Sequence, residues 1–191
     1  GFFIMTEALS AEQLNKVMDE ADLLISQQDV EAALDTLAEQ ITARLSKEMP
    51  VVYAIMNGGL VVAGQLLTRL KFPLEQGYMH ATRYRGDITA QSDLQWQALP
   101  SVPMDGRTVL IIDDIFDEGY TLEAVINACK AQGAKEVLTA VLIDKEHDRK
   151  APGMSVDFTG LKVEDRYVFG YGMDYRGYWR NAPGIYAVKG L

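Results

Sequence analysis

Blocks of consecutive apolar residues alternate along this chain with stretches whose apolar residues recur every three or four positions. The blocks at 51–56, 109–112 and 137–144 are rich in Val, Ile and Leu, as expected of strands buried on both faces. The stretches at 60–70 and 122–132 have helical spacing, and each follows a block. This order predicts an α/β fold in which helices flank a doubly wound, mainly parallel sheet.

The N-terminal region is predicted to be helical over residues 10–47. Ser10 and the residues after it form an N-terminal capping box, and Leu14, Val17 and Met18 follow at helical spacing. A second run with one apolar face begins near Asp29, and Pro50 ends the region.

The alternation is broken at residues 76–104. Two antiparallel strands, at about 77–85 and 93–98, are predicted on either side of a polar loop at 86–92. A loop of this kind is often a lid over a binding site, but a plain surface hairpin explains 77–104 equally well. Further on, 156–158 is predicted to be a short strand, and 166–175 is rich in aromatic residues and glycine.

Two buried blocks run into residues that bind ligands well. Asp113 and Asp114 follow the block at 109–112, and a turn at 117–121 leads into the next helix. Ligands of open α/β sheets bind at the carboxyl ends of the strands, where a helix N-terminus attracts phosphate. Two carboxylates there suit a divalent metal or sugar hydroxyls. The block at 51–56 likewise ends in a glycine-bearing loop, so both loops are expected to converge on one ligand.

Composition narrows the class of protein. A chain of 191 residues corresponds to a single domain, 1–191, that can bury a sizeable core. The net charge of −9 argues against a nucleic-acid partner and against binding to an anionic membrane. Because no apolar run approaches 18 residues, no membrane span is expected. Residues 1–4 are interpreted as a non-native extension before a native start at Met5.

Cysteine and histidine are scarce. Cys129 is the only cysteine, so a disulfide within the chain is impossible and a cytoplasmic setting is favoured. A buried structural thiol is expected at this position. His80 and His147 are too far apart in sequence to form a zinc motif with one cysteine, which argues against a zinc enzyme.

The strand, acidic pair and turn together resemble the phosphoribosyl diphosphate (PRPP) signature of the type I phosphoribosyltransferases. That signature has four hydrophobic residues, two acidic residues, two variable residues and then Asp-x-Gly-x-Thr. The chain matches it at Asp113, Asp114, Asp117, Gly119 and Thr121. A generic doubly wound protein with an acidic strand end, such as a phosphatase or a response regulator, is the plainer alternative.

The C-terminal region narrows the resemblance to the hypoxanthine-guanine phosphoribosyltransferases. Their purine-pocket segment is matched by 169–175, and their aromatic-Arg pair by Trp179 and Arg180. The resemblance covers about residues 20–190. It implies the type I phosphoribosyltransferase fold, with a small hood built from N- and C-terminal segments and a purine-binding tail at 160–191.

The resemblance also assigns roles to residues. It implies two catalytic residues. Asp117 would act as general acid/base at purine N7, and Tyr84 would lie in the lid. Contacts to PRPP and its phosphates fall on Asp113, Asp114, Asp117, Glu118, Gly119, Tyr120, Thr121, Met56, Asn57, Gly58 and Arg180. Contacts to the purine fall on Lys145, Tyr167, Val168 and Asp174. Mg²⁺ is the implied cofactor, held by Asp113, Asp114 and Asp174. The first peptide of the loop at Met56 is often cis in this family.

The implied reaction moves the phosphoribosyl group of PRPP to hypoxanthine or guanine, giving IMP or GMP and pyrophosphate in purine salvage. The implied assembly is a homodimer or homotetramer. Asn57 stands where a lysine is common, and Glu118 and Tyr120 replace smaller or basic residues. A xanthine-preferring enzyme and a non-catalytic PRPP-sensing regulator on the same fold therefore stay open as alternatives.

Overall fold

The larger of two sheets in the computed structural model, which describes residues 8–83 and 94–191, has six strands. Its strand order is β4-β3-β2-β5-β6-β7. The strands are β2 (Val51–Ile55), β3 (Glu75–Arg83), β4 (Leu94–Ala98), β5 (Thr108–Phe116), β6 (Glu136–Lys145) and β7 (Phe158–Val163). All neighbours are parallel except the edge pair β3 and β4. The mainly parallel sheet is therefore as the sequence predicts.

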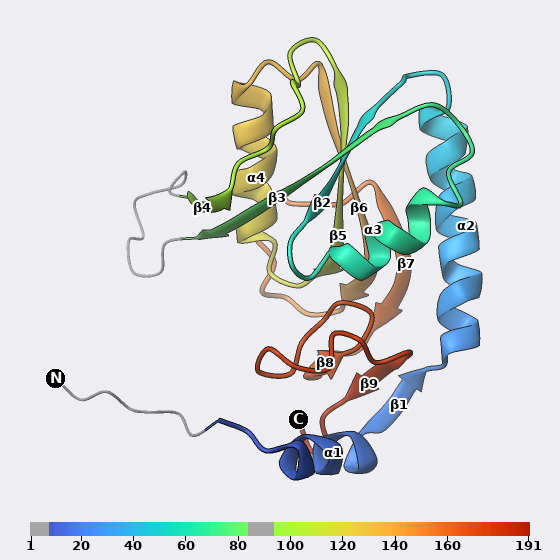
Figure 1. Ribbon diagram of the computed structural model, residues 1–191, viewed down its shortest axis with the longest axis vertical. Coiled ribbons are helices and arrows are strands. Elements are labelled where there is room, and N and C mark those ends of the chain that lie inside the picture. Colours follow the sequence, from blue (N-terminus) through green and yellow to red (C-terminus); the bar gives the residue numbers. More distant parts are fainter. Residues whose placement is uncertain (1–7, 84–93) are drawn as a thin grey trace, which may run out of the picture.

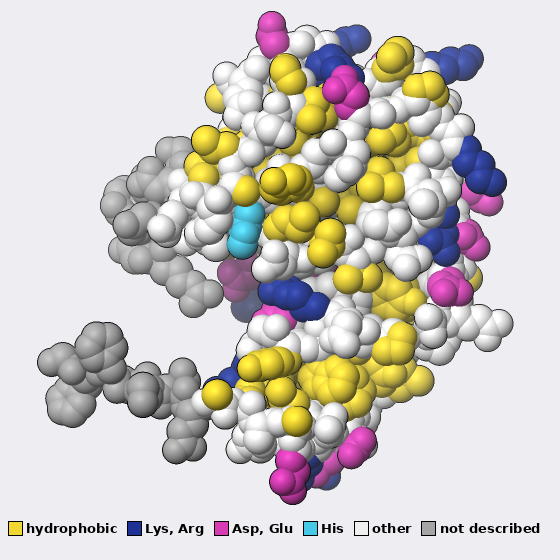
Figure 2. All heavy atoms as spheres, in the orientation of Figure 1, with side chains coloured by type: hydrophobic (Ala, Val, Ile, Leu, Met, Phe, Trp, Pro, Cys, Tyr) yellow, Lys and Arg dark blue, Asp and Glu magenta, His cyan; other side chains and the backbone are white. Residues whose placement is uncertain are grey.

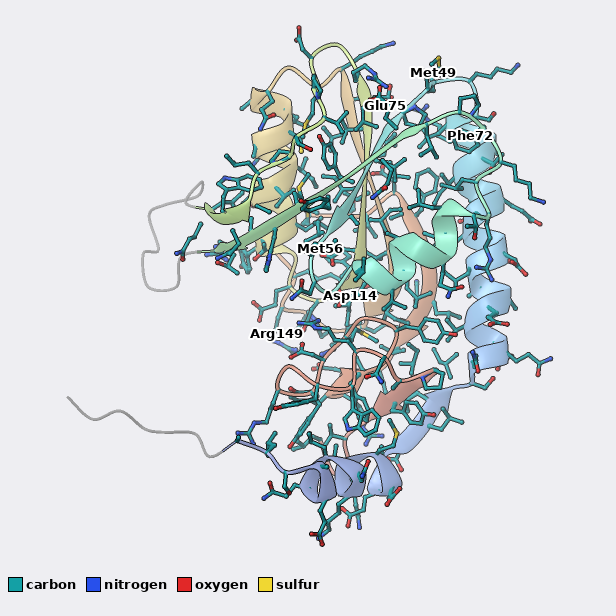
Figure 3. All side chains as sticks on the ribbon, viewed as in Figure 1. Met49, Met56, Phe72, Glu75, Asp114 and Arg149 are labelled. Carbon is teal, nitrogen blue, oxygen red and sulfur yellow. The ribbon has the colours of Figure 1, made fainter. Side chains whose placement is uncertain are left out.

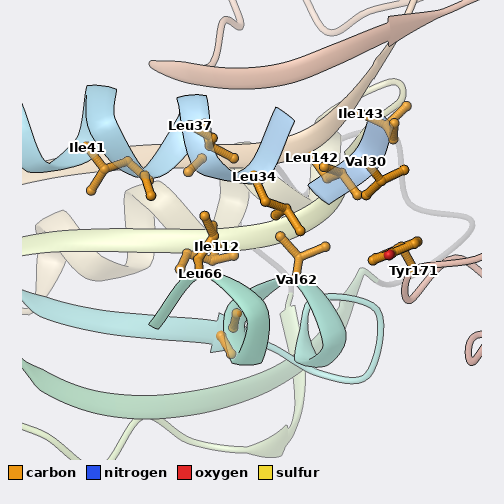
Figure 4. Close-up of a cluster of buried hydrophobic side chains, with 14 of the residues drawn as sticks. Val30, Leu34, Leu37, Ile41, Val62, Leu66, Ile112, Leu142, Ile143 and Tyr171 are labelled. Atoms are coloured by element: carbon orange, nitrogen blue, oxygen red, sulfur yellow. The ribbon is translucent and has the colours of Figure 1, made fainter. Parts of the chain in front are cut away.

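Helices cover both faces of this sheet because successive strand residues point to opposite sides (Figure 1). On one face, α2 (Gln27–Leu45) and α3 (Leu60–Leu67) pack over side chains that include Val52 and Leu110. Figure 4 shows Val62 and Leu66 of α3 among the apolar side chains of this core. On the other face, α4 (Tyr120–Ala131) packs over the alternate strand positions. The sheet is thus doubly wound.

A small second sheet joins the two ends of the chain. Its order is β1-β9-β8, all antiparallel, with β1 at Asp22–Ile25, β8 at Val168–Phe169 and β9 at Ile185–Ala187. The helix α1 (Ala11–Glu20) is fixed to the C-terminal segment where Trp179 Nε1 donates a hydrogen bond to the Leu14 carbonyl at 2.9 Å. This hood lies beyond the carboxyl ends of the large sheet's strands (Figure 1).

Two predictions of secondary structure are wrong. The region 10–47 is not helical throughout, because the strand β1 separates α1 from α2. Because β1 has only four residues, its pattern of apolar and polar side chains is too short to distinguish a strand from the end of a helix. The strand predicted at 156–158 begins at Phe158 and runs to Val163, with mostly half-buried side chains. Within the described part of the chain, no helix combines the length and apolar character needed to cross a membrane.

Candidate active site

The predicted ligand-binding loops meet at one edge of the sheet, between its strands and the hood. Figure 2 shows a hollow between these two parts of the molecule, where acidic and basic side chains gather. Figure 3 places Met56, Asp114 and Arg149 at this edge, Asp114 near the end of β5 and the other two in the loops that follow β2 and β6. The parallel strands β2, β5 and β6 bring the loops together because all three end there.

Asp113 and Asp114 lie on β5 itself, which continues past them to Phe116. Asp114 is buried, and its backbone N–H donates to Asp113 Oδ1 at 2.9 Å. Burial raises the pKa of Asp113 well above its usual range, and the neighbouring Asp114 carboxylate raises it further. Burial also raises the pKa of Asp114. A positive charge close to this pair would stabilise both carboxylates.

The loop at Met56–Gly58 packs directly on this acidic pair. The Met56–Asn57 peptide bond is cis, as the resemblance implied. A Cβ atom on Gly58 would lie 2.4 Å from Asp114 Oδ2, so only glycine lets the loop approach so closely. From the hood side, Gly172 adopts a φ of +99°, and a Cβ there would lie 2.0 Å from the Gly58 carbonyl oxygen. The two glycines bring loop, carboxylates and hood into contact.

The segment at 117–121 forms the N-terminus of α4. Gly119 is the N-cap residue with a φ of +87°, a conformation that glycine adopts without strain. Because glycine has no side chain, the N–H groups of the first turn are not capped by it, and they remain available to an anion. Glu118 is exposed, and its carbonyl accepts a hydrogen bond from the Ala151 N–H at 2.7 Å. The Arg83 guanidinium lies 4.8 Å from the ring centre of Tyr120.

Asp117 is held between two side chains from the end of β6. Its Oδ2 atom lies 3.3 Å from Lys145 Nζ, and its Oδ1 atom lies 2.7 Å from His147 Nε2. The Asp117 side chain is 44% exposed, whereas those of Lys145 and His147 are 12% and 2% exposed. The open side of the carboxylate can therefore meet a ligand while the opposite side is fixed by the protein.

The C-terminal tail supplies an aromatic wall and a guanidinium. Tyr167 is 39% exposed, and its ring centre lies 5.7 Å from that of Tyr175. Arg180 donates to the Gly172 carbonyl at 2.6 Å and lies 3.7 Å from Asp174. The positive charge of Arg180 is also among the groups that lower the pKa of Asp113. The hood therefore contributes an exposed tyrosine ring, and it places the positive charge of Arg180 close enough to act on the acidic pair.

Most of the predicted site residues belong to these loops, but three need comment. Asp174 accepts a hydrogen bond from the Gly177 N–H at 2.7 Å and so stabilises a turn of the tail. Val168 is buried on β8, paired with Ala187. Tyr84 and the predicted lid loop at 86–92 lie outside the described residues.

Within the described residues, no group of three or more His, Cys, Asp or Glu side chains is placed to hold a metal ion. Asp113 and Asp114 thus form a pair that Asp174 does not complete.

His147 is the site residue that the sequence did not reveal. The histidine and cysteine spacing bears only on a zinc site and indicates no contact with Asp117. The available signal was its position two residues after Lys145, in a loop that had to end at the same edge as Asp117.

Comparison with known proteins agrees with this architecture. Residues 21–176 match the phosphoribosyl transferase domain model. A hypoxanthine-guanine-xanthine phosphoribosyltransferase of Tritrichomonas foetus is 30% identical over 190 residues, which is 97% of each chain. A hypoxanthine-guanine phosphoribosyltransferase of Bacillus subtilis is 29% identical, over 87% of this chain and 92% of the relative. The chain belongs to the phosphoribosyl transferase family.

A solved structure supports the same assignment. A hypoxanthine phosphoribosyltransferase of Staphylococcus aureus superposes with a TM-score of 0.84 at 26% identity, covering 90% of this chain and 94% of the other. The resemblance to the hypoxanthine-guanine phosphoribosyltransferases is thus confirmed over nearly the whole chain.

Proposed function

We propose that this protein transfers the 5-phosphoribosyl group of PRPP to hypoxanthine or guanine, giving IMP or GMP and pyrophosphate. The observation that carries this proposal is the arrangement around Asp117. A half-exposed carboxylate lies between the N-terminus of α4, which suits a phosphate, and Lys145, which suits a 6-oxo group. The full-length relatives, which are named for this reaction, support it.

The ribose phosphate fits the loop at 117–121. Its 5-phosphate would accept hydrogen bonds from the N–H groups of the first turn of α4 and from the Thr121 hydroxyl. Glu118 and Tyr120, the two departures from the usual loop, are both exposed, so neither side chain fills the turn. Arg180 and the backbone of Met56–Gly58 would bind the pyrophosphate. Asn57 contributes no positive charge there, which leaves Arg180 as the proposed cationic contact to this group.

Magnesium fits the acidic pair. Mg²⁺ takes oxygen ligands and often binds to proteins through one or two carboxylates, with substrate phosphates and water completing its shell. Asp113 and Asp114 offer such a pair. Burial raises the pKa of both carboxyl groups, and the charge of Asp114 raises that of Asp113 further, so a bound cation would stabilise the ionised pair. When bound, the ion would neutralise charge on the leaving pyrophosphate. Asp174, already bound within its turn and near Arg180, is proposed only for a second ion.

The purine would lie between the tail and the end of β6. Tyr167 offers an exposed ring on which a base can stack. Lys145 would donate to the 6-oxo group, and the Val168 carbonyl would meet the exocyclic edge. Asp117 would take the N7 proton as N9 attacks C1 of the ribose. Tyr84 is proposed to close over the transition state. No covalent nucleophile is needed, since the site acts by placing the reactants and stabilising charge.

The same site could accept xanthine, since one relative is named for all three bases. We also propose that the protein forms a homodimer or homotetramer. We propose that it acts in the cytoplasm, where thiols stay reduced, because its one cysteine is a buried free thiol.

The test is nucleotide formation from PRPP and Mg²⁺ with hypoxanthine, guanine, xanthine and adenine offered separately. We expect rapid IMP and GMP formation with adenine inert, since Lys145 can donate to a 6-oxo group but cannot accept from a 6-amino group. Transfer to adenine at a similar rate would contradict the assignment of Lys145. PRPP binding with no product from any base would favour the PRPP-sensing regulator instead.

A further inference from the structure

We propose that His147 is a positioning residue for Asp117: it fixes the carboxylate so that one oxygen is directed to the purine. This inference rests on the proposed function, because it concerns the residue that would take the N7 proton. Its basis is the 2.7 Å contact between His147 Nε2 and Asp117 Oδ1, made by an imidazole that is almost fully buried.

The second ring nitrogen of His147 determines which form of the imidazole is present. The backbone N–H of Arg149 donates to His147 Nδ1 at 3.0 Å, so Nδ1 acts as an acceptor and carries no proton. The remaining proton then lies on Nε2, which donates to Asp117 Oδ1. Because the donor to Nδ1 is a main-chain group two residues away, the loop at 147–149 holds the ring in this orientation.

Several charged groups surround this contact. Lys145 lies on the Oδ2 side of Asp117 at 3.3 Å. Arg149 directs its guanidinium away, into a pair of hydrogen bonds with Asp165 at 2.7 and 3.0 Å. The Arg149 side chain therefore binds Asp165, while its backbone N–H donates to His147. Asp117 thus has one neutral donor and one cationic neighbour, one at each oxygen.

The arrangement assigns the two carboxylate oxygens different tasks. Oδ1 is bound by the Nε2–H of His147 at 2.7 Å, whereas Oδ2 has only the longer, 3.3 Å contact with Lys145. Once Lys145 donates to the 6-oxo group, as proposed above, Oδ2 is the atom left to accept the N7 proton. In that step the N7–H bond breaks, its electron pair stays with the purine, and an O–H bond forms at Oδ2. His147 keeps its own proton throughout. It acts by orientation, in the way that buried partners orient other catalytic groups.

A matched pair of variants separates the donor from the ring. His147→Phe keeps the volume and removes the N–H donor, while His147→Gln places an amide N–H near the Nε2 position. We expect His147→Phe to lower kcat for IMP formation about ten- to a hundredfold, the range for one hydrogen bond to a charged group. The KM for PRPP should change little, and His147→Gln should recover most of the loss. Equal losses in both variants, or a rise in KM alone, would overturn the proposal.

A double-mutant cycle tests whether His147 acts through Asp117. In an Asp117→Asn background, adding His147→Phe should lower kcat no further, because the group to be positioned is already lost. A second, multiplicative loss would mean that His147 acts by some other route and would contradict the proposal.

Nitrogen-15 NMR of the histidine rings gives a readout that does not depend on turnover. The chain has two histidines, so a His80→Gln variant assigns the signals of His147. We expect the Nε2–H form for His147 in the wild-type protein and a changed Nε2–H signal in Asp117→Asn. An Nδ1–H form would overturn the proposal. If the wild-type protein makes no nucleotide, the proposed function fails, while the NMR experiment still decides whether His147 holds Asp117.

Discussion

At the scale of single residues, burial determines how Cys129 behaves. Its side chain lies on α4 and packs into the core between this helix and the sheet, and burial raises the pKa of the Cys129 thiol to about 11. The unfolded chain loses this proton at lower pH, so the thiol's contribution to stability is present below about pH 8.5 and is lost as pH rises through 11.

This predicts a pH-dependent difference between the wild-type protein and Cys129→Ala. The alanine variant loses packing at every pH. The stability advantage of the wild type over Cys129→Ala should shrink by about 2 kcal/mol between pH 8 and pH 10. Urea unfolding of both proteins across this range measures the difference, and the other alkaline titrations cancel in the comparison. A constant difference would show that the thiol is not shielded as the structure indicates.

Residues also differ in how readily a sequence reveals them. Asp113 and Asp117 could be predicted because they interrupt or follow an apolar block at fixed spacing. The placement of Lys145 relied on resemblance, and the structure brings it within 3.3 Å of Asp117. His147 could not be predicted, because its role depends on a contact across 30 positions of sequence and on a loop conformation that no local pattern encodes.

At the scale of elements, the contact between the tail and the Met56–Gly58 loop depends on a single glycine. Replacing Gly172 with alanine would place a Cβ atom 2.0 Å from the Gly58 carbonyl oxygen, and the residue would keep a positive φ. We expect Gly172→Ala to destabilise the fold by more than about 2 kcal/mol and to lower nucleotide formation, because the hood must move away from the site.

Gly177→Ala is the matched control. Gly177 lies in the same tail with a φ of +90°, and nothing lies within 4 Å of its added Cβ. The free energy of unfolding of this variant should fall only by the cost of a positive φ, about 1–2 kcal/mol, and turnover should be nearly unchanged. Thermal unfolding and turnover of the two variants provide the comparison. Equal effects in both would mean that the close contact at Gly172 is unimportant.

The elements that were predicted well are the ones with strong periodicity. Strands buried on both faces, such as β2 and β6, appear as unbroken apolar blocks, and α4 follows a clear turn signal. The strands that were misplaced or missed, β7 and β1, are partly exposed and depend on pairing with distant segments. Their hydrogen bonds stabilise them only in the folded chain, so local sequence carries little information about them.

At the scale of the whole molecule, the site belongs to two sheets at once. The large sheet supplies Asp113 and Lys145, the turn between β5 and α4 supplies Asp117, and the tail that includes β8 supplies Tyr167 and Arg180. Because β1 and β9 pair across almost the full length of the chain, the N-terminal segment supports the tail that would bind the purine. The doubly wound sheet follows from local patterns, whereas the hood followed only from family resemblance.

The central claim is that this composite site carries out phosphoribosyl transfer with Asp117 as the proton acceptor. The most direct measurement compares wild-type protein with Asp117→Asn, recording the turnover of IMP formation and the equilibrium binding of PRPP in the presence of Mg²⁺. We expect turnover to fall by about a hundredfold or more, since an amide cannot take the N7 proton, with PRPP affinity nearly intact. Wild-type turnover in Asp117→Asn, or a loss explained wholly by weaker PRPP binding, would contradict it.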